Sequence, residues 1–174
     1  MVINSPSTAL PRARGTLLIH ACTRAMTAPL EWVLATVLEH PVSLDWMAQP
    51  IAPSMLRASF EWSGVVGQAE RIVSGVRGIP NVRFEVTQMS PTPGFDQRWS
   101  YVPSLGVFRS DIDVHGNIMV NELRIRHAME SNSTDATALM TALDQTLGTA
   151  WDAELEPFRI ASDGDSVRWV NQVG

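Results

Sequence analysis

The order strand–helix–strand–strand–helix–strand, readable between residues 15 and 89, constrains the fold more than any other feature of this chain. Four segments alternate apolar and polar residues, the period of a half-buried strand: 16–22, 42–49, 55–62 and 82–88. Two segments space their apolar residues as an amphipathic helix does: 27–38 and 66–77. Together they predict a ferredoxin-like split βαβ unit (βαββαβ), an α+β fold with antiparallel sheet order 4-1-3-2.

In this arrangement both helices cover one face of the sheet. Trp46 and Trp62 fall in phase with the apolar positions and are expected to anchor that core face. The other face would carry Leu18, His20 and Cys22 among charged neighbours. This mixture is too polar for a core, so we expect the rest of the chain, a second subunit or a ligand to lie across it.

The second half reads as an extension and not as a repeat of the first. We predict a β-hairpin followed by two helices, the second carrying leucines at four-residue steps and ending before Pro157. Asn121 is the expected cap of the first helix. The corresponding ranges are 97–101, 105–110, 122–129, 135–156 and, for a last short strand, 167–170. The domain prediction is therefore a flexible arm (1–14), the ferredoxin-like unit (15–89) and an extension packed on it (90–174).

Composition excludes several functions. The chain of 174 residues has a net charge of −5, and its thirteen basic residues are all arginine. The absence of lysine excludes Schiff-base chemistry and a phosphate-binding P-loop. A single cysteine, Cys22, allows neither an internal disulfide nor a multi-cysteine zinc site. No apolar run is long enough for a membrane span, and we expect a cytoplasmic protein.

Nucleic-acid binding is not expected, although RNA-recognition modules share this strand order. Those modules stack bases on aromatic residues of the open sheet face. Here Phe60, Trp62 and Phe84 are in phase with the core side, and the net charge is negative.

The densest group of metal-type ligands is Asp111, Asp113 and His115. An extended segment would place all three on one side, so a two-carboxylate, one-imidazole site is sterically conceivable. A polar turn ending in a glycine is the favoured interpretation, because the triplet lacks the spacing of known metal motifs. We predict no metal and no cofactor.

Several blocks of sequence resemble an actinobacterial family of domains of unknown function, DUF3145. The similar blocks are 42–50, 83–87, 100–108, 115–116 and 147–159, and the similarity spans residues 15–173. The resemblance implies a cytoplasmic protein of high-GC Gram-positive bacteria. It supplies no activity and no catalytic residues.

Two functions remain. The first is a non-catalytic binding or regulatory module that acts through protein–protein contacts with a partner or with a second copy. The alternative is a small-molecule-binding protein or enzyme with a pocket between the open sheet face and the extension. The candidate binding residues for that pocket are His20, Arg57, Tyr101, Asp111 and His115.

Overall fold

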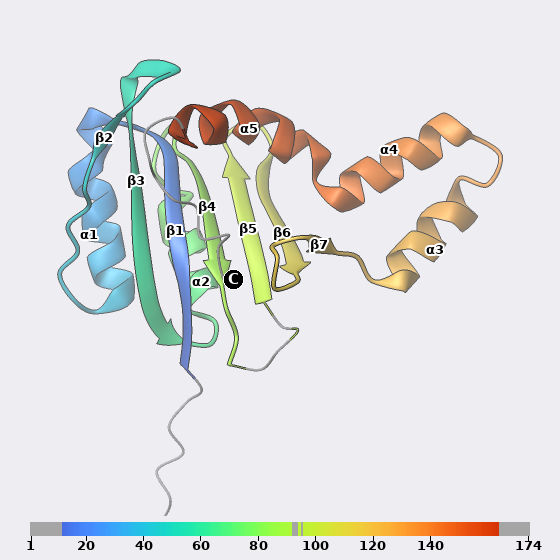
Figure 1. Cartoon of the computed structure of the whole chain (residues 1–174), viewed down its shortest axis with the longest axis horizontal. Helices are drawn as coiled ribbons and strands as arrows, with labels where there is room; N and C mark the ends of the chain where they lie inside the picture. Colours follow the sequence, from blue (N-terminus) through green and yellow to red (C-terminus); the bar gives the residue numbers. More distant parts are fainter. Residues whose placement is uncertain (1–11, 92–93, 95, 164–174) are drawn as a thin grey trace, which may run out of the picture.

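A single seven-stranded antiparallel sheet forms the centre of the computed structural model, which describes residues 12–91, 94 and 96–163 (Figure 1). The strands lie in the order β2-β3-β1-β4-β5-β6-β7. Their bounds are β1 Arg12–Thr23, β2 Met47–Gln49, β3 Ala52–Val65, β4 Arg83–Gln88, β5 Asp96–Val102, β6 Gly106–Ile112 and β7 Ile118–Met119.

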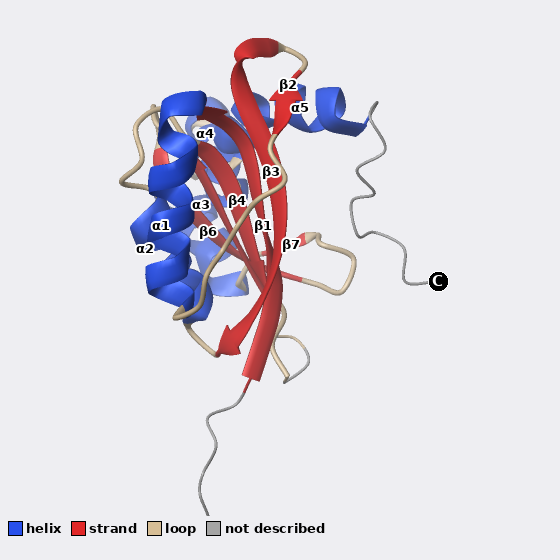
Figure 2. Ribbon diagram, turned by 90° about the vertical axis from the view of Figure 1, so that its left-hand side faces the viewer, coloured by secondary structure: helices blue, strands red, loops and turns tan. Residues whose placement is uncertain are grey.

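The helices lie on both sides of this sheet. They are α1 Thr27–Leu38, α2 Gln68–Val76, α3 Glu122–Ser131, α4 Ala136–Leu147 and α5 Thr149–Asp163, with a short 3-10 turn at Arg24–Met26. Figure 2 shows α1 and α2 covering one face, while α5 crosses the opposite face near one end of the strands. Helices α3 and α4 extend sideways from the sheet (Figure 1). None of the described helices is both long enough and apolar enough to cross a membrane.

The predicted fold class, a ferredoxin-like unit with a four-stranded sheet of order 4-1-3-2, is wrong. The sheet does not end at β4, because β5 pairs with β4 in antiparallel register from Phe84↔Tyr101 to Gln88↔Gln97. Strands β6 and β7 then continue the same sheet. The expected separate hairpin therefore extends the sheet, and α5 covers the face that a ferredoxin-like unit leaves open.

The core lies between the sheet and the pair α1 and α2. Amphipathic spacing explains both helices, since Leu30 and Leu34 of α1 and Ile72 and Val76 of α2 are fully buried. Trp62 is buried in this core as expected. Trp46 packs against it from a loop, where its indole Nε1 and the backbone N–H of Leu44 both donate to Glu31. Those bonds to Glu31 hold residues 42–46 outside the sheet, so the strand predicted at 42–49 is only three residues long.

Cys22 lies in the core and not on the open face with His20. The register of β1 shifts between Ile19 and Cys22 against β3, and between Ile19 and Ala21 against β4. A β-bulge adds a residue to one strand and so reverses the alternation beyond it. His20 therefore stays on the open face while Cys22 turns to the helix-covered one.

The long helix predicted to end before Pro157 is two helices, so the described part of the extension has three. Gly148 ends α4 in the left-handed conformation with φ +71°, and a side chain there would overlap the ring of Phe108. Helix α5 then includes Pro157 and continues to Asp163. The cap predicted at Asn121 is confirmed, because its side chain accepts from the backbone N–H of Leu123. Residues 1–11 of the expected arm and the strand predicted at 167–170 lie outside the described residues, and Arg12–Arg14 belong to β1.

Candidate functional site

A buried carboxylate on the face opposite α1 and α2 joins three strands to α5. Glu85 of β4 is 3% exposed and accepts hydrogen bonds on both oxygens. His20 Nε2 lies 2.8 Å from Oε2, and Ser100 Oγ donates to Oε1 over 3.1 Å. From α5, Arg159 donates through Nε to Oε2 at 3.0 Å and through Nη2 to Oε1 at 2.6 Å. The paired Arg159 donors give the two-pronged geometry that favours arginine over lysine.

The ionisation of this cluster is fixed by its contacts. Burial alone would raise the pKa of Glu85, but the hydrogen bonds and charges of His20 and Arg159 hold it well below the ordinary range. For Arg159, burial would lower the pKa, and its bonds to Glu85 and Asp152 raise it above its usual value instead. The carboxylate and the guanidinium are thus a permanent ion pair at neutral pH.

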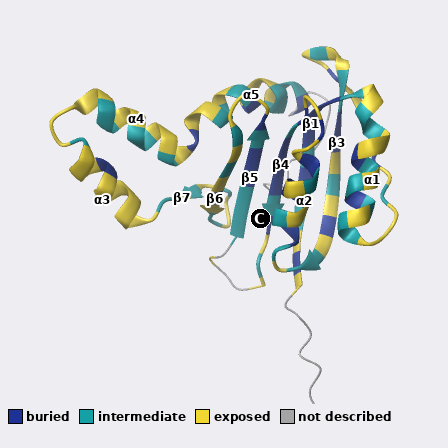
Figure 3. Ribbon diagram, turned by 180° about the vertical axis from the view of Figure 1, so that it is seen from behind, coloured by how far each residue is buried: buried dark blue, intermediate teal, exposed yellow. Residues whose placement is uncertain are grey.

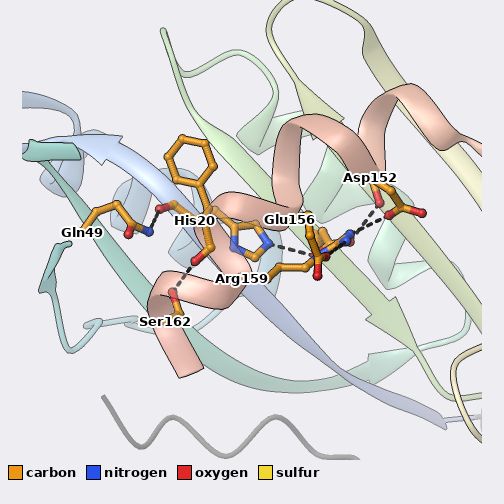
Figure 4. Close-up of polar contacts among 9 residues, drawn as sticks. His20, Gln49, Asp152, Glu156, Arg159 and Ser162 are labelled. Atoms are coloured by element: carbon orange, nitrogen blue, oxygen red, sulfur yellow. Dashed lines mark hydrogen bonds and ion pairs between the residues drawn. The ribbon is translucent and has the colours of Figure 1, made fainter. Parts of the chain in front are cut away.

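Arg159 also binds the acidic residues of its own helix. Its Nη2 lies 2.9 Å from Asp152 and its Nη1 lies 3.1 Å from Glu156 (Figure 4). Glu154 takes a different partner, since it lies 3.9 Å from Arg83, whose guanidinium sits over the ring of Phe158. These contacts fasten α5 to the sheet by charge as well as by packing.

A small open pocket lies beside the end of α5, with room for about one water molecule (about 20 Å³). Its walls are Leu18, Ile19, His20, Met47, Arg57, Ala58, Ser59 and Ser162. Arg57 is buried and its Nε donates to the carbonyl of Ala48 at 3.2 Å. Gln49 Nε2 donates to the His20 carbonyl, and Ser162 Oγ to that of Phe158 (Figure 4). Two basic side chains are therefore held at the wall of one pocket.

Of the five predicted binding residues, the structure brings only His20 and Arg57 together. Tyr101 faces the other side of the sheet and stacks on Phe84, with ring centroids 5.1 Å apart. Asp111 of β6 is exposed and accepts from the side-chain amide of Gln97. His115 lies in the turn after β6. A site composed of all five is not assembled, and the binding role of His20 and Arg57 stays a prediction.

The acidic turn is organised by Asp113. Its carboxylate accepts the backbone N–H groups of His115 and Asn117 and the side-chain amide of Asn117, and these bonds lower its pKa. Within the described residues, no group of three or more histidine, cysteine, aspartate or glutamate side chains could hold a metal ion.

The residues that sequence reasoning did not single out are Glu85 and Arg159. Glu85 pairs directly with Leu18 of β1, which was expected on the same sheet face as His20. The alternation of β4 therefore already placed Glu85 on the open face. Arg159 lies near the end of a helix, 74 positions after Glu85. Nothing local indicates that it reaches a carboxylate 74 positions earlier.

A second candidate surface is the α3–α4 arm, residues 122–147. In α3 only Ala128 is buried, and in α4 no residue is. Figure 3 shows both helices mostly exposed at the side of the molecule. Five large apolar side chains of the arm are exposed: Leu123, Ile125, Met129, Met140 and Leu147. Isolated helices of this length are only marginally stable in water. Contact with a partner would therefore stabilise the arm more than the rest of the molecule.

Comparison with known proteins gives one family. The model of the family described as "Protein of unknown function (DUF3145)" matches residues 16–172. No curated protein and no solved structure matches the chain.

Proposed function

Because this chain belongs to the DUF3145 family, whose description names no activity, we propose a function from the surface it presents: a non-catalytic module that acts through protein–protein contacts. The element that makes the contact is the α3–α4 arm. The observation that carries the proposal is that this arm buries one side chain within the molecule and exposes five large apolar ones. Exposed apolar surface concentrated in one element is typical of interaction sites.

The partner that fits the arm is a second copy of the chain. Two helical hairpins can bury their apolar sides against each other as a four-helix bundle. In a two-fold symmetric dimer the same surface of each copy forms the interface, so each arm buries its apolar side against the arm of the other copy.

The charges of the arm are compatible with that pairing. Helix α3 carries two arginines, Arg124 and Arg126, and two glutamates, Glu122 and Glu130, and Arg126 pairs with Glu122. The charged residues of α4 and its cap are Asp144 and Asp135. Because the charges of α3 balance, packing α3 of one copy against α4 of the other would set no block of like charges against another.

The small-molecule alternative has weaker support. Ligand pockets usually enclose about 300–1,000 Å³. The pocket beside His20 and Arg57 has room for about one water molecule, as described above. It suits a single functional group and not a whole metabolite.

Light scattering over a dilution series tests the proposal. We expect a mass of two chains that falls towards one on dilution. Met140→Glu should weaken the dimer at least tenfold, about 1.4 kcal/mol, because it places a charge in the apolar contact. Trp32→Glu is the matched control, since Trp32 is also an exposed apolar residue but lies on α1, and it should leave the dimer unchanged. A single-chain mass at every concentration, or a dimer indifferent to Met140→Glu, would contradict the proposal.

A further inference from the structure

An arginine on the open sheet face has no partner in the part of the chain that the structure describes. Arg98 of β5 points away from the core, because Trp99, the next residue along the strand, is buried in it. The Nε of Arg98 is buried without a hydrogen-bond partner, and no ion pair joins the guanidinium to another described residue. Burying a charged donor is costly unless an acceptor compensates it. Arg98 therefore differs from Arg159 of α5, which is paired with Glu85 on the same face.

The two strands beside β5 place hydroxyl groups next to Arg98 on the same face. Thr87 of β4 and Ser110 of β6 both pair directly with Arg98 in the antiparallel register. Side chains at such positions have Cβ atoms about 4.5–5.5 Å apart. Ser110 is 7% exposed, and its Oγ is buried without a hydrogen-bond partner. Thr87 Oγ1 accepts the backbone N–H of Thr16 at 3.1 Å, so its own O–H can still donate.

The described carboxylates of this face either have other partners or lie farther away. Glu85 accepts hydrogen bonds on both oxygens from the partners described above. Asp96 of β5 accepts the backbone N–H of Ser90 at 2.8 Å. Glu61 of β3 is separated from Arg98 by β1 and β4. The positive charge of Arg98 thus lies between two hydroxyl groups and lacks an acidic partner, which are surroundings that suit a bound anion.

We propose that the sheet face around Arg98 binds a small oxyanion, either a phosphate or a carboxylate group. The guanidinium of Arg98 pairs with two of its oxygens, and the hydroxyls of Thr87 and Ser110 donate from either side. Guanidinium groups recognise phosphates and carboxylates through two parallel hydrogen bonds. One guanidinium between two hydroxyls suits a single anionic group and not a polyanion such as a nucleic acid. The site uses no residue of the α3–α4 arm, so it does not depend on the proposed dimer.

Thermal unfolding of the full chain in different salts tests this site. The midpoint is measured in sodium phosphate, sodium acetate and sodium chloride at one pH and equal ionic strength, so that screening is the same in each. A ligand that binds the folded chain raises the midpoint as its concentration increases. Phosphate, acetate or both should raise the midpoint above its value in chloride, and the salt that acts at the lower concentration identifies the anionic group. A midpoint that neither salt raises above its value in chloride would overturn the inference.

Variants separate the site from the general stabilisation that phosphate gives to folded proteins. Arg98→Gln should weaken binding about tenfold or more, because it removes the charged partner of the anion. Arg109→Gln is the matched control: it removes the same charge from the neighbouring strand, but its guanidinium lies over Trp99 on the other face. It should respond to the salts as the wild-type chain does. Equal responses of the wild-type chain and Arg98→Gln, or equal losses in Arg98→Gln and Arg109→Gln, would overturn the inference.

Calorimetric titration gives a second readout that does not depend on unfolding or on the folding of Arg98→Gln. Wild-type chain titrated with the preferred salt should show saturable binding at one site per chain. Ser110→Ala removes only a hydroxyl and should weaken this binding several-fold. The absence of saturable binding, or an affinity that Ser110→Ala leaves unchanged, would overturn the inference.

Discussion

At the scale of single residues, Glu85 links the sheet to α5, the helix on the face opposite α1 and α2. It receives bonds from β1, β5 and α5 while lying in β4. A buried ion pair adds little over a well-packed apolar pair, but removing one partner leaves an uncompensated charge. The cluster therefore matters less for total stability than for the position of α5 on the sheet.

Arg159→Met should expose this dependence. It removes the paired donors of Glu85 and leaves the carboxylate buried, so we expect the free energy of unfolding to fall by about 3 kcal/mol. Urea unfolding followed by circular dichroism measures the change. Arg71→Met is the control, since Arg71 lies 3.7 Å from Glu39 with both side chains exposed, and it should cost below about 0.5 kcal/mol. Equal losses for the two variants would contradict the role given to Glu85.

The same carboxylate predicts a pH dependence. Its pKa is lower in the folded chain than its usual value of 4.5, so its stabilising contribution is present above that value and is lost as the pH falls. Each pH unit below 4.5 should lower the free energy of unfolding by up to about 1.4 kcal/mol through this one group. Glu85→Gln should be less stable at neutral pH and should depend less steeply on pH in acid. Urea unfolding at several pH values checks this, and parallel pH profiles for the two chains would contradict it.

At the scale of elements, the break between α4 and α5 decides where the extension lies. Gly148 turns the chain with a positive φ, and Phe108 of β6 fills the space beside it while also packing on Trp151 at 5.1 Å. The break lets α5 lie over the sheet while α4 extends away from it (Figure 1).

Gly148→Ala should therefore destabilise the chain for two reasons. The left-handed conformation costs a residue with a side chain about 1–2 kcal/mol, and the new Cβ would overlap the Phe108 ring. We expect a lower midpoint of thermal unfolding. Combining it with Phe108→Ala should remove the overlap but not the conformational cost, so the effects of the two changes should be less than additive. Gly116→Ala is a control for conformation alone, since its φ is +82° with open space around it.

The elements also show how far the sequence can be interpreted. The positions of α1, α2, β3 and β4 follow from apolar periodicity, and the phase of β4 correctly puts Phe84 inside. The pairing of β5 with β4 could not be predicted, because alternation identifies a strand but not its neighbour. The bulge after Ile19 has no composition signal, and it moved Cys22 to the other face. At the candidate site, His20 and Arg57 could be placed on the open face from the alternation of their strands. The position of Arg159 could not, because it depends on the path of α5, which the turn at Gly148 sets.

At the scale of the whole molecule, packing is uneven. The sheet with α1 and α2 holds a continuous core, and α5 adds a charged layer on the other side (Figure 2). The α3–α4 arm has few buried contacts of its own. Elements with little burial open locally at low free energy.

Hydrogen exchange should report this difference. In the dissociated chain, amides of α3 and α4 should exchange far faster than those of β1 and β4, because the arm can open without disturbing the core. Association should slow exchange in the arm and leave the central strands unchanged. Mass spectrometry of peptides at low and high protein concentration measures both. Arm amides as protected as those of β1 in the dissociated chain would contradict the low local stability assigned here.

The contact between Glu85 and Arg159 has a consequence for synthesis on the ribosome. Its partners are separated by 74 positions, and α5 also lies over β1, the first described strand. Contacts between distant parts of a chain slow folding, because a long loop must close before they form. Strands β1, β3 and β4 can pair while translation proceeds, yet the Glu85 carboxylate of β4 lacks its arginine partner until α5 has left the exit tunnel. The second face of the nascent sheet therefore stays open until α5 can cover it.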